Sequence, residues 1–173
     1  MTASAAPPAI PPLPAPNSAE PFRRQPAWEL ALAVQQLALC AQPFAWGAAD
    51  CLTTPADAVL AITGVDPLAP WRGRYRSRQE AEALLAALAP DAAPEDRLSA
   101  VVAAVMAAHG APHIAPAFAQ HGDVALCRWP EAGRGERPRD HCGFVSAAAV
   151  MLPARRGLTQ VPLAQATAAW RIG

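Results

Sequence analysis

The segment from residue 43 to residue 64, PFAWGAADCLTTPADAVLAITG, contains a helix signal and a thiol at its start. A helix is expected from Cys51 to about Thr63, because Pro55 lies in the first turns, where proline is tolerated, and Gly64 follows as a stop. Cys51 would then lie at the helix N-terminus. The macrodipole and free N–H groups of that end stabilise an anion, so they lower the pKa of a thiol placed there.

Apolar periodicity around this segment predicts further elements. Three more helices are expected at residues 28–40, 81–88 and 95–109, the middle one opened by a capping box of Ser77 and Glu80. Short β-like runs follow at residues 123–127, 142–152 and 157–161, with a Gly/Arg/Pro loop at 130–140. Helices therefore precede strands, and this order predicts an α+β domain whose helices pack on one small antiparallel sheet.

The chain is expected to hold one folded domain. At 173 residues it is long enough to bury a core. Residues 1–26 are rich in Pro, Ala and Ser, so they predict a disordered arm, solvated or ordered by a partner protein, ahead of a domain at residues 27–173. The start of the chain has no signal-peptide pattern, because prolines interrupt every apolar window.

Composition excludes several classes of function. All 14 basic residues are Arg, and they balance 14 acidic residues, which argues against capture of nucleic acid or an anionic membrane by bulk charge. No apolar run reaches 18 residues, so no membrane span is expected. Four cysteines without regular spacing predict reduced thiols rather than a disulfide framework.

A candidate reactive pair consists of Cys51 and His141, which opens the second expected strand. The chain contains no phosphate-binding loop, no dinucleotide-binding glycine motif, no Gly-x-Ser-x-Gly elbow and no His-Glu-x-x-His zinc helix. A cysteine at a helix start followed by a histidine on a later strand is the order found in papain-like hydrolases. The alternative is that Cys51 is a small buried side chain.

Three segments resemble motifs of NlpC-type cell-wall cysteine peptidases, which are papain-like: PFAWGAADC at 43–51, GDVAL at 122–126 and HCGFV at 141–145. A wider set is similar to a small family found among the tail genes of tailed phages and prophages. That set adds TGVDP at 63–67, RGRY at 72–75, and the ending GL, VPL and AWRI at 157–172. The resemblance covers roughly residues 28 to 172.

The resemblance implies a phage or prophage tail-associated cysteine hydrolase of peptidoglycan peptide amides, with Cys51 as nucleophile and His141 as general base. It implies no cofactor, other tail proteins as partners, and a location at the virion tail tip or in the host cytoplasm during assembly. The alternative is a catalytically inert tail-tip or tail-assembly protein that keeps the fold. A distance of about 3 to 4 Å between the sulfur and a ring nitrogen would favour the enzyme.

The chain departs from the NlpC-type pattern in the supporting residues. The tyrosine that helps to bind the oxyanion falls on Phe44, and the small Ser-Gly pair after the cysteine is replaced by Leu52 and Thr53. The strand after the histidine lacks the usual polar residue that orients the imidazole. Candidates for these supporting roles are Asp50, Trp46, Ser146, Asp140 and Gln160.

Two other clusters invite a binding role. Arg72, Arg74, Arg76 and Arg78 alternate, so an extended segment would place four guanidinium groups on one side, where they could clamp a phosphate, a carboxylate or an acidic partner. The alternative is a solvated loop paired with local acidic residues. A second cluster, at residues 109–127, holds three histidines and a cysteine, but its spacing matches no zinc motif, and no metal is expected.

Overall fold

The computed structural model describes residues 9–129 and 138–173, which form an α+β fold. The helices are α1 (Trp28–Ala41), α2 (Thr53–Thr63), α3 (Arg78–Leu88) and α4 (Arg97–Ala108). The strands are β1 (His113–Ile114), β2 (Val124–Trp129), β3 (Arg139–Ser146), β4 (Ala149–Ala154), β5 (Gly157–Pro162) and β6 (Ala166–Trp170). Short 3-10 helices lie at Pro116–Phe118 (η1) and Leu163–Gln165 (η2).

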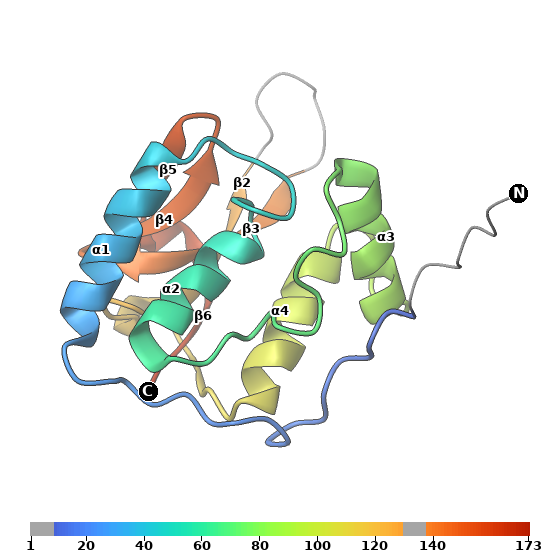
Figure 1. Ribbon diagram of the computed structural model, residues 1–173, viewed down its shortest axis with the longest axis horizontal. Helices are drawn as coiled ribbons and strands as arrows, with labels where there is room; N and C mark the ends of the chain where they lie inside the picture. The colour runs from blue at the N-terminus through green and yellow to red at the C-terminus, as the bar shows by residue number, and fades with distance from the viewer. Residues whose placement is uncertain (1–8, 130–137) are drawn as a thin grey trace, which may run out of the picture.

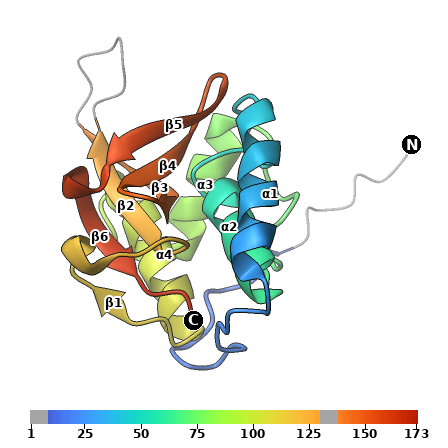
Figure 2. The same ribbon diagram turned by 90° about the vertical axis from the view of Figure 1, so that its left-hand side faces the viewer.

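The six strands form one antiparallel sheet in the order β1-β6-β2-β3-β4-β5. Figures 1 and 2 show the four helices gathered on one side of this sheet. The expected arrangement of helices packed on a small antiparallel sheet is therefore confirmed. Two cores result, one between helices and sheet, and a smaller one on the opposite face beside η1 and η2.

The main core explains why the helices lie where they do. Leu32 and Leu39 of α1 are seven residues apart and both buried, so they form the inner face of that helix. Val59 and Ile62 of α2 are buried in the same cluster as Phe144 of β3. These contacts press α1 and α2 onto the sheet and fix where the start of α2 meets β3.

The helix predictions agree with the structure apart from their ends. The expected helices at residues 28–40 and 81–88 correspond to α1 and α3, and that at 95–109 corresponds to α4. Helix α2 begins at Thr53, so Cys51 lies in the turn just before it. In the predicted capping box, Ser77 accepts the backbone N–H of Glu80, whereas the Glu80 carboxylate accepts the N–H of Arg76.

The prediction of one strand over residues 142–152 is wrong, because that run folds as the β3–β4 hairpin. Ser146 pairs with Ala149, leaving Ala147 and Ala148 as the turn. Ala147 has φ +52°, a left-handed conformation that a tight hairpin demands and that glycine usually supplies. The turn itself contains no glycine, and this concealed it in the sequence. Strands β1 and β6 were not predicted, and residues 130–137 of the expected loop lie outside the described residues.

Residues 9–26 of the predicted arm lie against the domain. Phe22 is buried and stacks on the His109 ring with centroids 4.3 Å apart. The indole N–H of Trp71 donates to the Pro11 carbonyl at 2.8 Å, and Arg24 donates to the Ile172 carbonyl at 2.6 Å. Composition predicts disorder, but these anchors hold the segment on α4 and near the C-terminus. Residues 1–8 of the arm lie outside the described residues.

Candidate active site around Cys51 and His141

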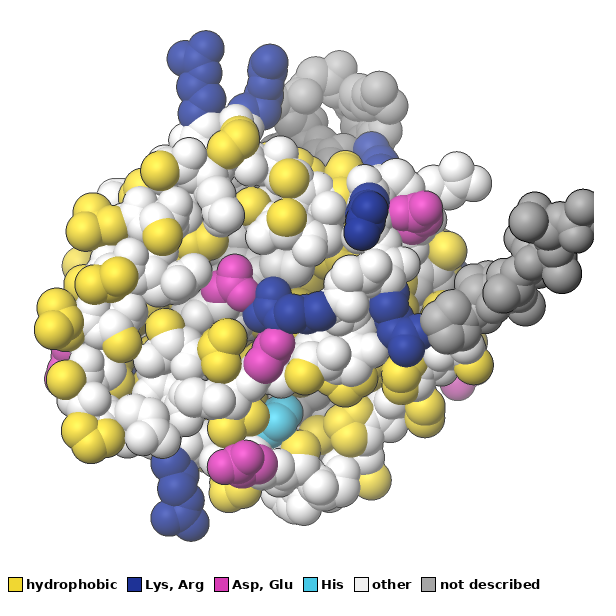
Figure 3. Space-filling model, viewed as in Figure 1, with side chains coloured by type: hydrophobic (Ala, Val, Ile, Leu, Met, Phe, Trp, Pro, Cys, Tyr) yellow, Lys and Arg dark blue, Asp and Glu magenta, His cyan; other side chains and the backbone are white. Residues whose placement is uncertain are grey.

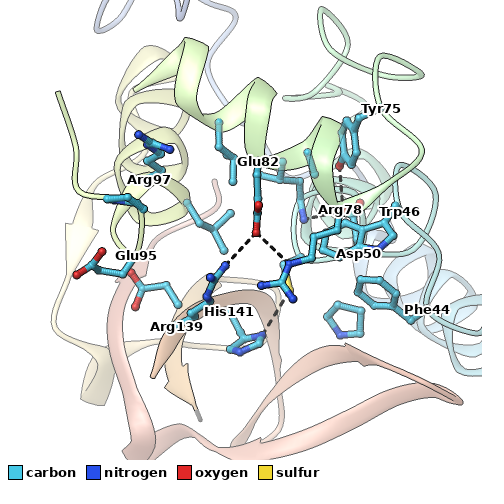
Figure 4. Close-up of a pocket in the computed structure, with 18 residues that line it drawn as sticks. Phe44, Trp46, Asp50, Tyr75, Arg78, Glu82, Glu95, Arg97, Arg139 and His141 are labelled. Carbon is cyan, nitrogen blue, oxygen red and sulfur yellow. Dashed lines mark hydrogen bonds and ion pairs between the residues drawn. The ribbon is translucent and has the colours of Figure 1, made fainter. Parts of the chain in front are cut away.

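The fold brings Cys51 and His141 together although they are 90 residues apart in the chain. The Cys51 Sγ lies 3.6 Å from the His141 Nδ1, within the range expected for a reactive pair (Figure 4). Both residues line a pocket of about 390 Å³. Cys51 reaches it from the turn before α2, and His141 from the first half of β3.

Strand pairing explains why there is a pocket beside His141. The ladder between β2 and β3 runs from Arg139 to Phe144, but the ladder between β3 and β4 runs only from Phe144 to Ser146. The β3–β4 pairing therefore stops before it reaches His141. Pro153, near the end of β4, lines the same pocket, so the pocket lies where the two strands separate.

The Asp50 carboxylate organises the turn that carries Cys51. Its Oδ1 accepts the N–H groups of Leu52 and Thr53, both at 2.9 Å, and its Oδ2 accepts the N–H of Gly47 at 2.7 Å. The Thr53 hydroxyl in turn accepts the Asp50 N–H at 2.9 Å. This reciprocal exchange caps the start of α2. Asp50 therefore positions the backbone around Cys51.

Tyr75 completes the Asp50 network, and sequence reasoning assigned it no role. Its hydroxyl donates to Asp50 Oδ1 at 3.1 Å, and its side chain is buried against the pocket. Burial, reinforced by the Asp50 charge, raises the pKa of Tyr75, so the phenol keeps the proton that it donates. Gly47 has φ +75°, and a Cβ there would lie 2.1 Å from the Tyr75 carbonyl oxygen. Glycine is therefore required where this turn meets Tyr75.

Two aromatic rings form an apolar wall of the pocket. Phe44 and Trp46 pack edge to face with centroids 4.9 Å apart, and both line the pocket. Trp46 is partly exposed, so it forms the outer part of this wall. Phe44 has no hydroxyl, so it cannot donate to an oxyanion.

Ser146 is not positioned to orient the His141 ring. It lies five residues further along β3, about 16 Å away for an extended strand, and it does not line the pocket. Gln160 lies on β5, two strands away. Asp140 does line the pocket, but its carboxylate is bound by Arg128 with Nε–Oδ1 at 2.9 Å. The prediction that Ser146 orients the imidazole is therefore wrong, because β3 places Ser146 too far from His141.

The predicted arginine clamp of Arg72, Arg74 and Arg76 does not form. The segment turns instead of extending, with Gly73 at φ +73°. Arg72 pairs with Asp57 at 2.6 Å and with Asp66, as in the alternative of local pairing. None of the three arginines lines the pocket.

A charged group formed by Arg78, Glu82 and Arg139 lines the pocket, and sequence reasoning singled out only Arg78, as the fourth arginine of the predicted clamp. The Glu82 carboxylate accepts hydrogen bonds from Arg78 at 2.9 Å and from Arg139 at 3.2 Å (Figure 4). These bonds, the one from Arg78 above all, lower the pKa of Glu82. The spacing of Arg78 and Glu82 on α3 could have revealed the first contact. The second joins residues 57 positions apart and has no local signal.

The other cysteines have different environments from Cys51. Burial raises the pKa of Cys127 to about 11 and that of Cys142 well above its ordinary value, whereas Cys40 is exposed on α1. Within residues 9–129 and 138–173, no three His, Cys, Asp or Glu side chains are grouped so as to hold a metal ion.

Fold and site together define an α+β protein in which a cysteine before a helix faces a histidine on an antiparallel sheet. The chain belongs to the family described as Domain of unknown function (DUF6950), whose model matches residues 23–172. Neither the curated proteins nor the solved structures gave a significant match. In the part of the chain that the structure describes, no helix has the length and apolar character needed to cross a bilayer.

Proposed function

We propose that the protein is a cysteine hydrolase of peptide amides. The observation that carries the proposal is the 3.6 Å approach of the Cys51 sulfur to the His141 ring in an accessible pocket. A thiol becomes a strong nucleophile when an imidazole can take its proton, and this distance permits that transfer. The start of α2 adds a favourable field for a thiolate.

In the proposed reaction, His141 takes the thiol proton and the Cys51 sulfur attacks the amide carbon. The tetrahedral intermediate collapses when His141 returns the proton to the leaving nitrogen, which departs as an amine and leaves a thioester on Cys51. Water then attacks the thioester carbon while His141 accepts its proton. The carbon–sulfur bond then breaks to release the acid, and His141 gives its proton to the leaving sulfur, which restores the thiol.

The resemblance to NlpC-type enzymes favours peptidoglycan peptides as substrate, a papain-like arrangement of the fold, and a setting in a phage or prophage tail. The pocket offers both apolar and charged partners for such a peptide. Phe44 and Trp46 offer an apolar wall for side chains, and the charged group around Glu82 offers partners for the polar backbone and carboxylates of the peptide.

The test is the rate of Cys51 alkylation by iodoacetamide between about pH 5 and pH 9. We expect an apparent thiol pKa below the ordinary value of about 8.5, and a rise in that pKa in the His141→Ala variant. Cys40→Ala is the background for both proteins, because Cys40 is the exposed competing thiol among the described cysteines. Cys127 and Cys142 are buried, so they should react only after unfolding.

Release of peptide fragments from purified peptidoglycan gives a second, independent readout. The Cys40→Ala protein should release fragments, and adding Cys51→Ala to it should abolish release. An ordinary Cys51 pKa that does not respond to His141→Ala would overturn the hydrolase proposal. Activated Cys51 without release would reject peptidoglycan as the substrate and keep the nucleophile.

The alternative is an inert structural protein, for example of a tail, that retains the fold. It is favoured by Phe44, which offers no hydroxyl where the NlpC-type pattern has one. The loss of an oxyanion donor costs on the order of a hundredfold or more in rate. In that case Cys51→Ala and His141→Ala would leave assembly with tail proteins unchanged, while substitutions at contact surfaces would impair it.

A further inference from the structure

Helix α1 has two apolar faces, and the one that points away from the core is unexplained by the candidate active site. Leu30, Val34 and Leu37 are 67%, 59% and 72% exposed and follow the spacing i, i+4, i+7. At 100° per residue they lie opposite the buried Leu32 and Leu39. Three exposed small residues widen this face, which we call the outer stripe together with the three large side chains: Ala33, Ala38 and Ala41.

The outer stripe carries no charge. Glu29, in the first turn, is the one charged residue of the whole helix. Figure 3 shows hydrophobic side chains gathered over α1 at the left of the molecule, where Figure 1 places this helix. A helix face on the surface of a folded domain is usually polar, so a continuous apolar stripe on it marks a contact with another protein.

We propose that the outer stripe joins two copies of this chain, which pack α1 against α1 antiparallel about a two-fold axis between Val34 and Leu37. In this arrangement Val34 lies against Leu37 of the second copy, and Leu30 lies against the small Ala41 of that copy. Large side chains thus meet small ones at the ends, as helix packing requires. A two-fold contact uses the same patch on both chains, which a single self-complementary stripe provides.

Charge at the two ends of α1 favours the antiparallel orientation. A Cβ on Gly157 would lie 2.1 Å from the Cys40 carbonyl oxygen, so the β4–β5 hairpin touches the C-terminal end of the helix. The turn of that hairpin holds Arg155 and Arg156, both exposed. An antiparallel second copy places its Glu29 beside these arginines, and the symmetry repeats the contact. A parallel pair would instead place each Glu29 at the end of the pair that is far from the arginines of the other copy.

The size of the outer stripe determines how tightly the two copies can bind each other. Helix α1 has 14 residues and is about 21 Å long, so its outer face alone covers much less than the roughly 800 Å² per partner of a stable complex. The dimer should therefore be weak and depend on protein concentration. Sedimentation velocity from about 10 µM to about 500 µM covers the range in which such a small contact forms.

A disulfide trap tests the orientation. Leu30 and Ala41 are 11 positions apart in the middle of the outer stripe, so the antiparallel pair brings residue 30 of one copy to residue 41 of the other. In a Cys40→Ala and Cys51→Ala background, Leu30→Cys combined with Ala41→Cys should give a covalent dimer under mild oxidation. The matched control with Ala41→Cys alone should not, because position 41 of one copy lies about 16 Å along the axis from position 41 of the other. Cross-linking of the control would show a parallel pair and overturn the proposal.

A charged substitution tests the surface without a cross-link. Leu37→Glu places two like charges near the two-fold axis and should weaken the dimer by about tenfold or more. Phe118→Glu is the matched control, because Phe118 is 70% exposed on η1, away from α1. The melting temperature and the alkylation of Cys51 show whether each variant stays folded.

A charge exchange shows whether the partner on the outer stripe is a second copy of the chain. Glu29→Arg should weaken the dimer, and combining it with Arg155→Glu and Arg156→Glu should restore it, because the pairs then form with reversed sign. Only a second copy of the same chain can show this restoration. A wild-type protein that stays monomeric up to the highest concentration, or equal effects of Leu37→Glu and Phe118→Glu, would overturn the proposal.

Discussion

The molecule buries a carboxylate in two turns, and the two differ in what neutralises the charge. Asp50 and Asp123 are 2% and 0% exposed, and each accepts backbone N–H groups. Asp123 also has two cations, Arg24 at 3.5 Å and Arg171 at 3.1 Å. Every hydrogen bond to Asp50 from the described residues comes from a neutral backbone or hydroxyl group.

The two carboxylates therefore have different roles. Asp123 holds distant segments of the fold together, and Asp50 supports the candidate active site. Asp123 accepts the N–H of Ile172, and Arg24 binds the Ile172 carbonyl, so this turn fastens the segment before α1 to the end of the chain. Among the described residues, Asp50 fastens only its own turn and Tyr75, beside the thiol. A buried carboxylate thus stabilises the fold where cations surround it, and shapes the electrostatics of Cys51 where they do not.

The largest effect is expected from Asp123→Asn. The neutral amide no longer pairs with two largely buried guanidinium groups, and one of its atoms turns from an acceptor into a donor. We expect a loss of about 3 kcal/mol in the free energy of unfolding, measured by urea titration. The alkylation rate of Cys51 in the folded protein should not change. A stability loss below about 0.5 kcal/mol would show that the cations contribute nothing there.

Asp50→Asn tests the buried carboxylate whose hydrogen-bond donors are all neutral. The amide oxygen can still accept the N–H groups of Leu52 and Thr53, but the amide nitrogen would face the N–H of Gly47, so one hydrogen bond is lost. We expect a stability loss of about 1 to 2 kcal/mol. Removing a negative charge beside Cys51 should also favour the thiolate and speed alkylation below neutral pH.

A control is needed to show that the effect on Cys51 is electrostatic. A general loosening of the turn would also lower the stability and speed alkylation, because it would increase the access of the reagent. The control is the reactivity of Cys51 at a pH high enough to ionise any thiol, where Asp50→Asn and wild type should react equally. Slower alkylation of Asp50→Asn at low pH would contradict an electrostatic role for Asp50.

Local signals in the sequence were enough for the helices and for the candidate pair. The spacing of apolar residues in α1 and the stop at Gly64 follow from backbone geometry, and the order of Cys51 and His141 matches a known arrangement. The resemblance also included Tyr75 within its RGRY motif, but nothing local could show that this side chain would reach Asp50. Such contacts depend on packing between segments 25 positions apart.

The wrong predictions of an arginine clamp and of a single strand over residues 142–152 have similar causes. Alternating arginines predicted an extended clamp, but Gly73 turns the chain and Arg72 finds Asp57 and Asp66, which lie earlier in the sequence. A hairpin turn made of two alanines has no compositional signal, because its left-handed residue is held by the pairing of β3 and β4. In both cases tertiary contacts decide a conformation that local preference leaves open.

The smallest effect is expected from Glu82→Gln, which sharpens the comparison because Glu82 has two cations, as Asp123 has, but is half exposed. Arg78 and Arg139 lower the pKa of Glu82, so folding stabilises its charged form. That stabilisation is present above the ordinary carboxyl pKa of about 4.3 and disappears as the pH falls through the lower pKa of the folded state. Since water screens these ion pairs, the substitution should cost less than about 1 kcal/mol at pH 7 and nothing near pH 3, as measured by urea unfolding at both values. A loss at pH 7 as large as that of Asp123→Asn would mean that pairing with cations, and not burial, decides what a carboxylate contributes to this fold.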